Sequence, residues 1–286
     1  MQIIQDCTNR DVLPHTLATE VEKVSHKLQS QRFRVAVVGE FSQGKSTLIN
    51  ALVREKIQPV RAIACNGTVT VLKHGLRKQI LCHYKDERKN QISEEQYQTL
   101  ATISKEAARK HRSDELARSD IEEIIFEHPD LDLCKNAVEI VDSPGLNEHP
   151  DRAAVTQKLL KDADAVIFIT DASKALTQGE RNLIQELRTQ INGGIENEPV
   201  NNLFIVVNKM DQLDSSEDRQ DVKELVEEFA YGQIPAITGK QRVHFVSAKA
   251  AMKAILGKTQ NEHLKTFHNF AQSLEKFLTR QSAEKY

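Results

Sequence analysis

Residues 39–46 read GEFSQGKS. This stretch matches the pattern G-x-x-x-x-G-K-[ST] at every fixed position. Residues 33–39 (FRVAVVG) before it are short, apolar and β-branched, which predicts a strand buried on both faces. A helix is expected to begin near Lys45. Strand, glycine-rich loop and helix in this order predict a phosphate-binding loop, because backbone N–H groups and a helix N-terminus can surround phosphate oxygens there.

Each loop residue has an expected role. The glycines let the backbone turn around the phosphates, Lys45 can reach the β- and γ-phosphates, and the Ser46 hydroxyl can bind Mg²⁺. A chance glycine-rich turn is the alternative, and the strand and helix on either side disfavour it. The predicted nucleotide-binding residues of the loop are Gly39, Gln43, Gly44, Lys45, Ser46 and Thr47.

A second motif, Asp142-Ser143-Pro144-Gly145, follows an apolar run at residues 137–142. In a D-x-x-G segment the Asp belongs to the Mg²⁺ shell and the Gly N–H senses the γ-phosphate. The same letters also form an ordinary turn. Position favours the motif, since the run is expected to end at the same edge of a parallel sheet as Gly39.

Two further motifs predict guanine as the base. Asn208-Lys209-Met210-Asp211 ends an apolar run at residues 203–207, and the Asp211 carboxylate can accept from both the N1–H and the amine of guanine. Adenine offers no such pair, so an unpaired carboxylate would disfavour ATP. Ser247-Ala248-Lys249 ends the last predicted strand, with the Ala248 N–H facing the guanine oxygen. Each motif alone could be a polar loop, but four in order predict a GTP site that includes Asn208, Lys209, Asp211, Ser247, Ala248 and Lys249.

The rest of the chain alternates between apolar runs and helical periods, which predicts a mostly parallel sheet between helices. Further strands are expected at residues 165–170, 203–208 and 242–247, and helices at 153–160, 181–187 and 222–229. Residues 69–73 and 79–84, joined through Gly75, are expected to form an antiparallel hairpin at the sheet edge. The polar stretch 85–132 is interpreted as an insertion at this edge, with short helices at 94–110 and 114–118.

Both ends of the chain carry apolar stripes with helical spacing. The N-terminal stripe spans residues 13–28 and the C-terminal stripe spans residues 264–278. Two arrangements are open: each helix covers a face of the sheet, or the two pair as a neck beneath the domain. The second arrangement is favoured because the two apolar stripes flank one domain in the sequence and need a common burial partner. Docking of Phe267, Phe270 and Phe277 to lipid is disfavoured because this helix lacks a dense basic face.

Composition excludes several classes of protein. The chain has 286 residues, 39% apolar and 28% charged, with a net charge of −2. This is typical of a folded domain and gives no reason to expect nucleic-acid binding. No run approaches the ~20 apolar residues of a membrane-spanning helix. The four cysteines form no Cys-x-x-Cys pair and no secretory leader is visible, so a cytoplasmic protein without a zinc site or disulfide scaffold is expected.

These motifs resemble the P-loop GTPases of the dynamin superfamily, especially the bacterial dynamin-like proteins. The resemblance rests on VVGEFSQGKSTLINAL (37–52), TVTVLKHG (68–75), VEIVDSPGLNEH (138–149) and FIVVNKMD (204–211). It implies a three-layer α/β/α fold with a mostly parallel sheet, an antiparallel edge strand and a helical neck. The implied division is a neck helix at 1–30, a GTPase domain at 31–258 and a second neck helix at 259–286.

The chain departs from this family at two places. Where bacterial members carry Pro-Thr-Thr or Pro-Cys-Thr, this chain reads Ala64-Cys65-Asn66-Gly67-Thr68, so Thr68 is the candidate for the last Mg²⁺ ligand beside Ser46 and Asp142. Leu146 follows Gly145 where small GTPases place a water-orienting Gln. The resemblance implies that a monovalent cation, K⁺ or Na⁺, and a second GTPase domain complete the site. It assigns the catalytic roles to Ser42, Lys45 and Gly145. An exposed loop serine without a catalytic part is the alternative for Ser42.

Two functions are expected from the sequence. The first is a Mg²⁺-dependent dynamin-like GTPase that hydrolyses GTP to GDP, forms a nucleotide-dependent homodimer and signals to a helical neck. The second is a slow GTP-controlled binding switch, associated with a ribosome or an assembly. The chain has no room for the stalk and membrane-binding tip of a full dynamin-like machine. Peripheral membrane association and membrane remodelling in a longer protein are therefore implied by the resemblance alone.

Overall fold

The computed structural model describes residues 32–40, 42–57, 69–100, 120–143, 159–160, 162–192, 194–195 and 198–284. The chain divides into two units, residues 1–33 and 34–286. The predicted N-terminal helix belongs to the first unit and lies outside the described residues. The second unit contains the phosphate-binding loop and all the structure discussed below.

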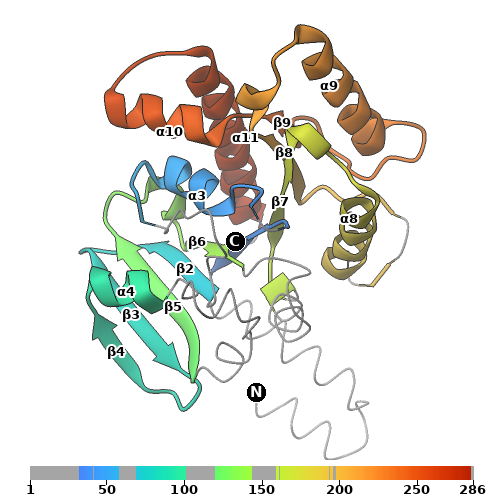
Figure 1. The fold of residues 1–286 in the computed structure, drawn as a ribbon. Helices are drawn as coiled ribbons and strands as arrows, with labels where there is room; N and C mark the ends of the chain where they lie inside the picture. The colour runs from blue at the N-terminus through green and yellow to red at the C-terminus, as the bar shows by residue number, and fades with distance from the viewer. Residues whose placement is uncertain are drawn as a thin grey trace, which may run out of the picture. The chain divides into compact units, whose positions relative to one another are not determined.

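A single mixed sheet forms the centre of this unit (Figure 1). In the described residues its nine strands have the order β4-β3-β5-β2-β6-β1-β7-β8-β9. The pairs β1–β7, β7–β8, β8–β9 and β2–β5 are parallel, whereas β2–β6, β3–β4 and β3–β5 are antiparallel. The strands are β1 Phe33–Val38, β2 Val69–His74, β3 Gln79–Tyr84, β4 Lys89–Ile92, β5 Ile121–His128, β6 Val138–Asp142, β7 Ala165–Asp171, β8 Leu203–Asn208 and β9 Val243–Phe245.

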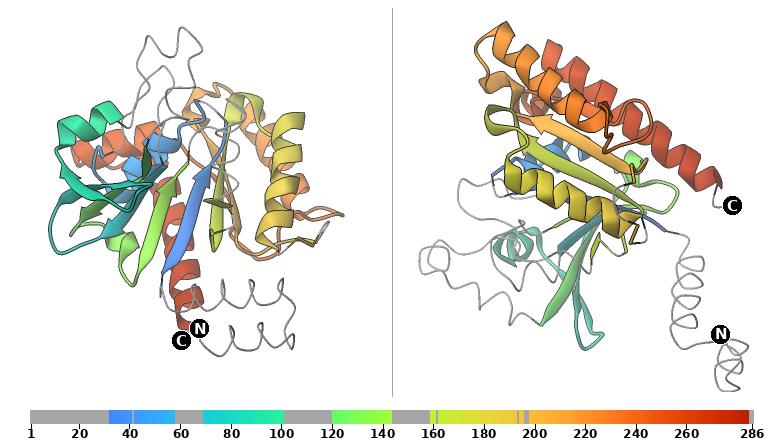
Figure 2. Two further views of the ribbon diagram at one scale, coloured as in Figure 1. Left: turned by 90° about the horizontal axis from the view of Figure 1, so that it is seen from below. Right: turned by 90° about the vertical axis from the view of Figure 1, so that its right-hand side faces the viewer.

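Helices cover both faces of this sheet. They are α3 Lys45–Val53, α4 Glu94–Leu100, α8 Gln178–Ile191, α9 Ser216–Tyr231, α10 Ala248–Gly257 and α11 Glu262–Glu284, with the 3₁₀ turns η1 Asp132–Cys134, η2 Ala172–Lys174 and η3 Met210–Gln212. Figure 2 shows α8 on one side of β7 and β8, with α10 and α11 on the other side. The predicted three-layer α/β/α class is confirmed.

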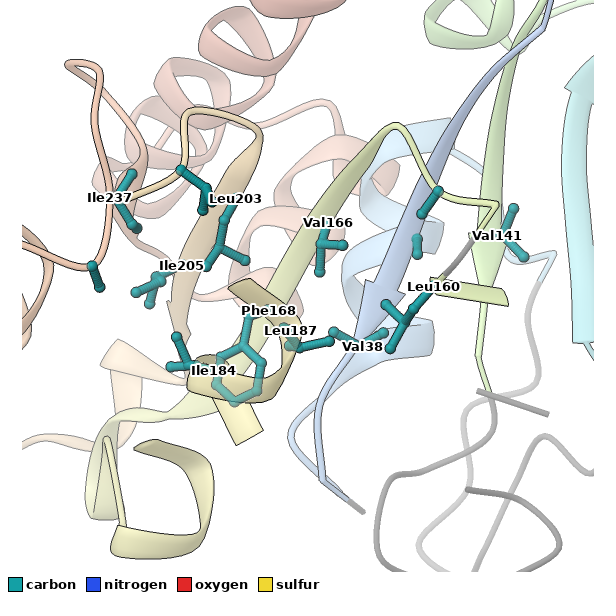
Figure 3. Close-up of a cluster of buried hydrophobic side chains, with 14 of the residues drawn as sticks. Val38, Val141, Leu160, Val166, Phe168, Ile184, Leu187, Leu203, Ile205 and Ile237 are labelled. Carbon is teal, nitrogen blue, oxygen red and sulfur yellow. The ribbon is translucent and has the colours of Figure 1, made fainter. Parts of the chain in front are cut away.

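The core lies between the sheet and the helices because successive strand residues point to opposite faces. On one face, Val166, Phe168 and Ile205 pack with Ile184 and Leu187 of α8 (Figure 3). Val226 and Ala230 of α9 join the same cluster. On the other face the ring of Phe204 meets the ring of Phe277 on α11, with centroids 5.4 Å apart. This burial on both faces explains why β7 is apolar at residues 165–169 and β8 at residues 203–207, before their polar ends.

The predicted edge hairpin is wrong. β2 and β3 do not pair with each other, because β5 lies between them and pairs with both. β5 comes from the stretch interpreted as a polar insertion, so that interpretation is also wrong for residues 121–128. Its buried residues Ile124, Ile125 and Phe126 supply the apolar centre of the strand, while charged residues flank them. Of the short helices expected at 94–110 and 114–118, α4 ends at Leu100 and residues 101–119 lie outside the described residues.

The C-terminal helix α11 packs against the sheet. Its buried apolar residues match the predicted stripe except that Phe270 is fully buried, whereas Ala271, which the spacing placed in the stripe, is half-buried. The other buried residues are Leu264, Phe267, Leu274, Phe277 and Leu278. α11 contacts β9 and α10, and its Phe270 ring lies 5.2 Å from the ring of His244. The helix therefore covers a face of the sheet, which is the arrangement that the sequence disfavoured, because the stripe finds its burial partners in the sheet and α10. Within the described residues, no helix is long and apolar enough to cross a membrane.

Candidate functional site

The four predicted motifs meet at the carboxyl edge of the parallel strands. Asn208, at the end of β8, joins two of them directly. Its Nδ2 donates to the backbone oxygen of Gln43 at 2.9 Å, and its Oδ1 accepts from the backbone N–H of Ala248 at 3.0 Å. Asn208 is 2% exposed, so this bridge is protected from water. The side chain thereby holds the phosphate-binding loop to the loop at the start of α10.

The glycines of the phosphate-binding loop are required by close contacts. A Cβ on Gly39 would lie 2.6 Å from the backbone oxygen of Ile169 on the neighbouring strand β7. Gly44 has φ +95°, and a Cβ there would collide with Nδ2 of Asn208. Both positions therefore exclude larger residues. The loop backbone can pass close to β7 and β8 only because these two side chains are absent.

The Lys45 side chain points back toward the loop that precedes it. Its ammonium donates to the backbone oxygens of Gly39 at 2.8 Å and Glu40 at 2.9 Å. Burial lowers the pKa of Lys45 to about 8, while the carboxylates of Asp142 and Glu40 act in the opposite direction. Asp142, at the end of β6, is fully buried. A lysine and an acidic group are thus held together beside the helix N-terminus of α3, as an anionic ligand and a divalent cation would require.

Two neighbouring loop residues have opposite environments. Ser42 is exposed and has φ +62°, a left-handed conformation that is uncommon for a residue other than glycine. Gln43 is 1% exposed, and its Nε2 donates to Oε1 of Glu180 at 3.1 Å. The loop therefore directs Gln43 into the protein and Ser42 away from it. Ser46 and Thr47 are half-buried in the first turn of α3.

The predicted base motif contains an ion pair that the sequence did not reveal. Lys209 has φ +64°, and its ammonium lies 2.6 Å from Oδ2 of Asp171 at the end of β7. Oδ1 of Asp171 accepts from both the N–H and the hydroxyl of Ser173. Burial raises the pKa of Asp171, but the bonds from Lys209 and Ser173 outweigh it and leave the pKa below its ordinary value. In the sequence, the one indication of this contact is Asp171 itself, an acidic residue at the end of an otherwise mostly apolar run.

The remaining base residues lie in η3 and at the start of α10. Asp211 is exposed and lies in η3, two residues after Lys209. The Ser247 hydroxyl accepts from the N–H of Ala250 and caps α10, while Ala248 is fully buried and Lys249 is exposed. Met210 donates its N–H to the oxygen of Val246 at 3.1 Å, which ties the two loops together. An exposed carboxylate beside a buried polar bridge is an arrangement that can recognise a base.

Some of the predicted site lies outside the described residues. This part comprises Gly145, Thr68 and the segment 64–67 that contains Asn66. Leu146 is also outside the described residues. The predicted metal ligands that can be located are Asp142, at the end of β6, and Ser46, in the first turn of α3.

A family model described as the dynamin family matches residues 35–211, which include three of the four motifs. The chain belongs to the dynamin family. Within this family it is 31% identical over 292 residues to a bacterial dynamin-like protein of Nostoc punctiforme. It is also 24% identical over 257 residues to mitofusin-2 of Rattus norvegicus. The alignments cover 96% and 85% of this chain, but 40% and 31% of those proteins.

The fold of this dynamin-family chain is also similar to a solved structure of an oligomerised bacterial dynamin pair. The superposition has a TM-score of 0.57 and a sequence identity of 21%, and it covers 97% of this chain and 41% of the other. This likeness supports the fold. The chain is thus a dynamin-like GTPase domain that spans less than half the length of these relatives.

Proposed function

We propose that this chain binds GTP, hydrolyses it to GDP with Mg²⁺, and completes its catalytic site by pairing with a second GTPase domain. The observation that carries the proposal is the buried bridge from Asn208 to Gln43 and Ala248. It joins the phosphate-binding loop to the two motifs that would recognise guanine. A nucleotide held along this edge would have its phosphates at the N-terminus of α3 and its base beside Asp211.

The residues at the phosphate end fit a magnesium ion. Mg²⁺ prefers oxygen ligands, and it is often bound by one or two carboxylates together with phosphates. Asp142 offers a fully buried carboxylate, and Ser46 offers a hydroxyl in the first turn of α3. We propose these two residues and Thr68 as ligands. When bound, the ion would neutralise charge on the β- and γ-phosphate oxygens.

In the proposed reaction a water molecule attacks the γ-phosphate directly. Lys45 would bind the β- and γ-phosphates, and the N–H of Gly145 would contact the γ-phosphate. Ser42 would lie near the bridging oxygen and a K⁺ or Na⁺ ion. Leu146 has no polar atom with which to orient the water, so the loop backbone and the second GTPase domain would do so.

A packed route connects the proposed site to the C-terminal helix. α10 begins at Ala248, whose N–H bonds to Asn208, and α10 contacts both α3 and α11. We propose that a change at the phosphates reaches α11 along this route. The chain would act in the cytoplasm, at the periphery of a membrane and as part of a longer protein. Its similarity to a bacterial dynamin pair described as a mechanism for sensing and tethering membranes supports a membrane role.

The test is nucleotide selectivity together with metal dependence. Fluorescent GDP, GTP and ATP analogues are titrated against the purified chain, and phosphate release is measured with Mg²⁺ and after chelation. We expect guanine nucleotides to bind about 100-fold more tightly than ATP, since adenine leaves the Asp211 carboxylate unpaired. Phosphate release should stop on chelation and fall when choline replaces K⁺ and Na⁺. Equal affinity for GTP and ATP would contradict the base assignment, and turnover without Mg²⁺ would contradict the metal assignment.

A further inference from the structure

Glu180, in the first turn of α8, is a carboxylate in an unusual place. It is 0% exposed, and among the described residues no lysine, arginine or histidine forms an ion pair with it. Burial raises its pKa, the negative charge of Glu40 acts in the same direction, and hydrogen bonds from Thr170 and Thr177 oppose them. A buried carboxylate without a cation is costly unless its oxygens are well hydrogen-bonded. A specific use for both oxygens would explain this residue.

One oxygen of Glu180 has a structural task. Oε2 accepts from the N–H of Thr177 at 3.0 Å and from its hydroxyl at 3.3 Å, while the Thr177 hydroxyl accepts from the N–H of Glu180. This is a capping box, which fixes the start of a helix. Capping needs only one carboxylate oxygen. The capping box therefore accounts for Oε2, but not for the hydrogen bonds that Thr170 and Gln43 donate to the same carboxylate.

The second oxygen faces the phosphate-binding loop. Oε1 accepts from Nε2 of Gln43 at 3.1 Å, across 137 positions of sequence. The other polar atom of that side chain, Oε1 of Gln43, is buried and makes no hydrogen bond in the described part of the chain. Among the described residues, Glu180 is thus the single hydrogen-bond partner of the Gln43 side chain. α8 also approaches the start of the loop, since a Cβ on Gly179 would lie 3.7 Å from Oε1 of Glu40.

The contact completes a clamp on one loop residue. Asn208 holds the backbone oxygen of Gln43 and Glu180 holds its side chain. The residues on both sides, Ser42 and Gly44, have left-handed φ angles of 62° and 95°. The left-handed angle is strained at Ser42 but not at the glycine, and such strain persists only where the surrounding contacts hold the backbone in place.

We propose that Glu180 is a positioning residue, which fixes the phosphate-binding loop through Gln43 and thereby sets the place of Ser42. This inference rests on the proposed GTPase function. Glu180 would not touch the nucleotide. The connection from β7 to α8 then forms an additional part of the site that none of the four motifs contains.

The variant Glu180→Gln tests the contact. A carboxylate accepts on both oxygens, whereas an amide accepts on one, so this variant loses one of the acceptors that face Gln43, Thr170 and Thr177. Gln43 can keep a bond to the new amide nitrogen only by turning its own amide, which moves its Nε2 away from the acceptor that now holds it. We expect kcat per bound nucleotide to fall about tenfold and KM to change by less than about threefold, because Lys45 and several backbone N–H groups still hold the phosphates. Glu186→Gln is the matched control, as Glu186 is exposed on the same helix.

A double-mutant cycle separates positioning from loss of folding. Gln43→Leu, Glu180→Gln and the double variant are compared by kcat and by the stoichiometry of fluorescent GDP binding. If Glu180 acts through Gln43, the second substitution should change kcat by less than about twofold once the first is present. If the fold losses in kcat of the two single variants multiply in the double variant, the proposal is overturned. It is also overturned if Glu180→Gln keeps the wild-type kcat per bound nucleotide and only the number of binding sites per chain falls. If the wild-type chain binds no GDP or GTP, the proposed function itself fails, whereas normal wild-type binding with an unaffected Glu180→Gln refutes this inference alone.

Discussion

At the scale of single residues, Asp211 carries the choice of base in the proposed site. Asp211→Asn replaces two acceptors by one acceptor and one donor, a pattern that suits xanthine better than guanine. We expect GTP affinity to fall by at least about tenfold and xanthosine triphosphate to become the preferred ligand. Competition of both nucleotides against fluorescent GDP measures the change. Asp214→Asn, a change at an exposed acid three residues later, should leave the preference for GTP intact, and a variant at Asp211 that still prefers GTP would contradict the assignment of residues 208–211.

Two residues of the phosphate-binding loop should separate binding from turnover. Lys45→Ala removes an ammonium that would contact phosphates in the ground state, so nucleotide binding should be lost. Ser42→Ala should keep binding and lower kcat by roughly 100-fold, because Ser42 is proposed to act in the transition state. Calorimetric affinity and single-turnover hydrolysis distinguish the two effects. Equal losses of affinity in both variants would leave Ser42 as a loop residue without a catalytic part.

The residues of the motifs could be predicted from sequence, but the contacts that join them could not. Each motif is a local pattern of four to eight residues, so its letters and its neighbouring strand suffice. The contacts of Gln43 with Asn208 and Glu180 span 165 and 137 positions. No local pattern relates such residues, because the strand order of the sheet brings them together. The pair of Asp171 with Lys209 was missed for the same reason.

At the scale of elements, prediction succeeded for the central strands and failed at one side of the sheet. β7 and β8 are buried on both faces and therefore appear as unbroken apolar runs. β5 mixes charged ends with a short apolar centre, since Glu123 faces Arg34 and Glu127 faces Lys73. These partners belong to β1 and β2, which are distant in sequence. The charged residues make the stretch 85–132 look like a polar insertion, although Glu123 and Glu127 form ion pairs within the sheet.

The packing of α11 on β9 buries His244, and from this burial we predict how the free energy of unfolding changes at low pH. The ring of His244 stacks on Phe204 and lies 5.2 Å from Phe270. Burial, together with the positive charge of Arg242, lowers the pKa of His244 from 6.5 to about 4, against the effect of a hydrogen bond with Gln241. Folding therefore favours the neutral ring. The contribution of neutral His244 to the free energy of unfolding is present above pH 6.5. It is lost as the pH falls toward 4, by an amount on the order of 3 kcal/mol.

His244→Phe should remove this contribution to acid sensitivity while it keeps an aromatic ring in place. Denaturant unfolding at pH 7 and pH 4.5 measures the free energy of unfolding for both proteins. We expect the variant to lose about 2 kcal/mol less than the wild type between these pH values. His263→Phe, which changes a histidine outside this ring cluster, serves as the control. An acid loss that is the same in His244→Phe and in the wild type would show that His244 becomes charged without disturbing α11.

At the scale of the whole molecule, the prediction concerns association between two copies. Leu146 cannot orient a water molecule, and the proposed site is complete only when a second GTPase domain is present. Specific activity should therefore rise with protein concentration, by about tenfold or more across the dissociation constant of the dimer, and then level off. Initial rates of phosphate release from about 0.1 to 50 μM protein measure this dependence. Light scattering or ultracentrifugation should detect dimers with GTP or a transition-state mimic, and monomers with GDP.

The shape of this concentration dependence distinguishes the two functions that the sequence allows. In a nucleotide-dependent dimer, binding energy between the copies is available only in the GTP state, so association and turnover should change together. Ser42→Ala should then still form dimers with GTP, because it retains the nucleotide while turnover is slow. A slow rate that is independent of concentration, with monomers in every nucleotide state, would instead mean that each copy hydrolyses GTP alone. The chain would then be a GTP-controlled binding switch, whose output is the state of α11 in a single copy.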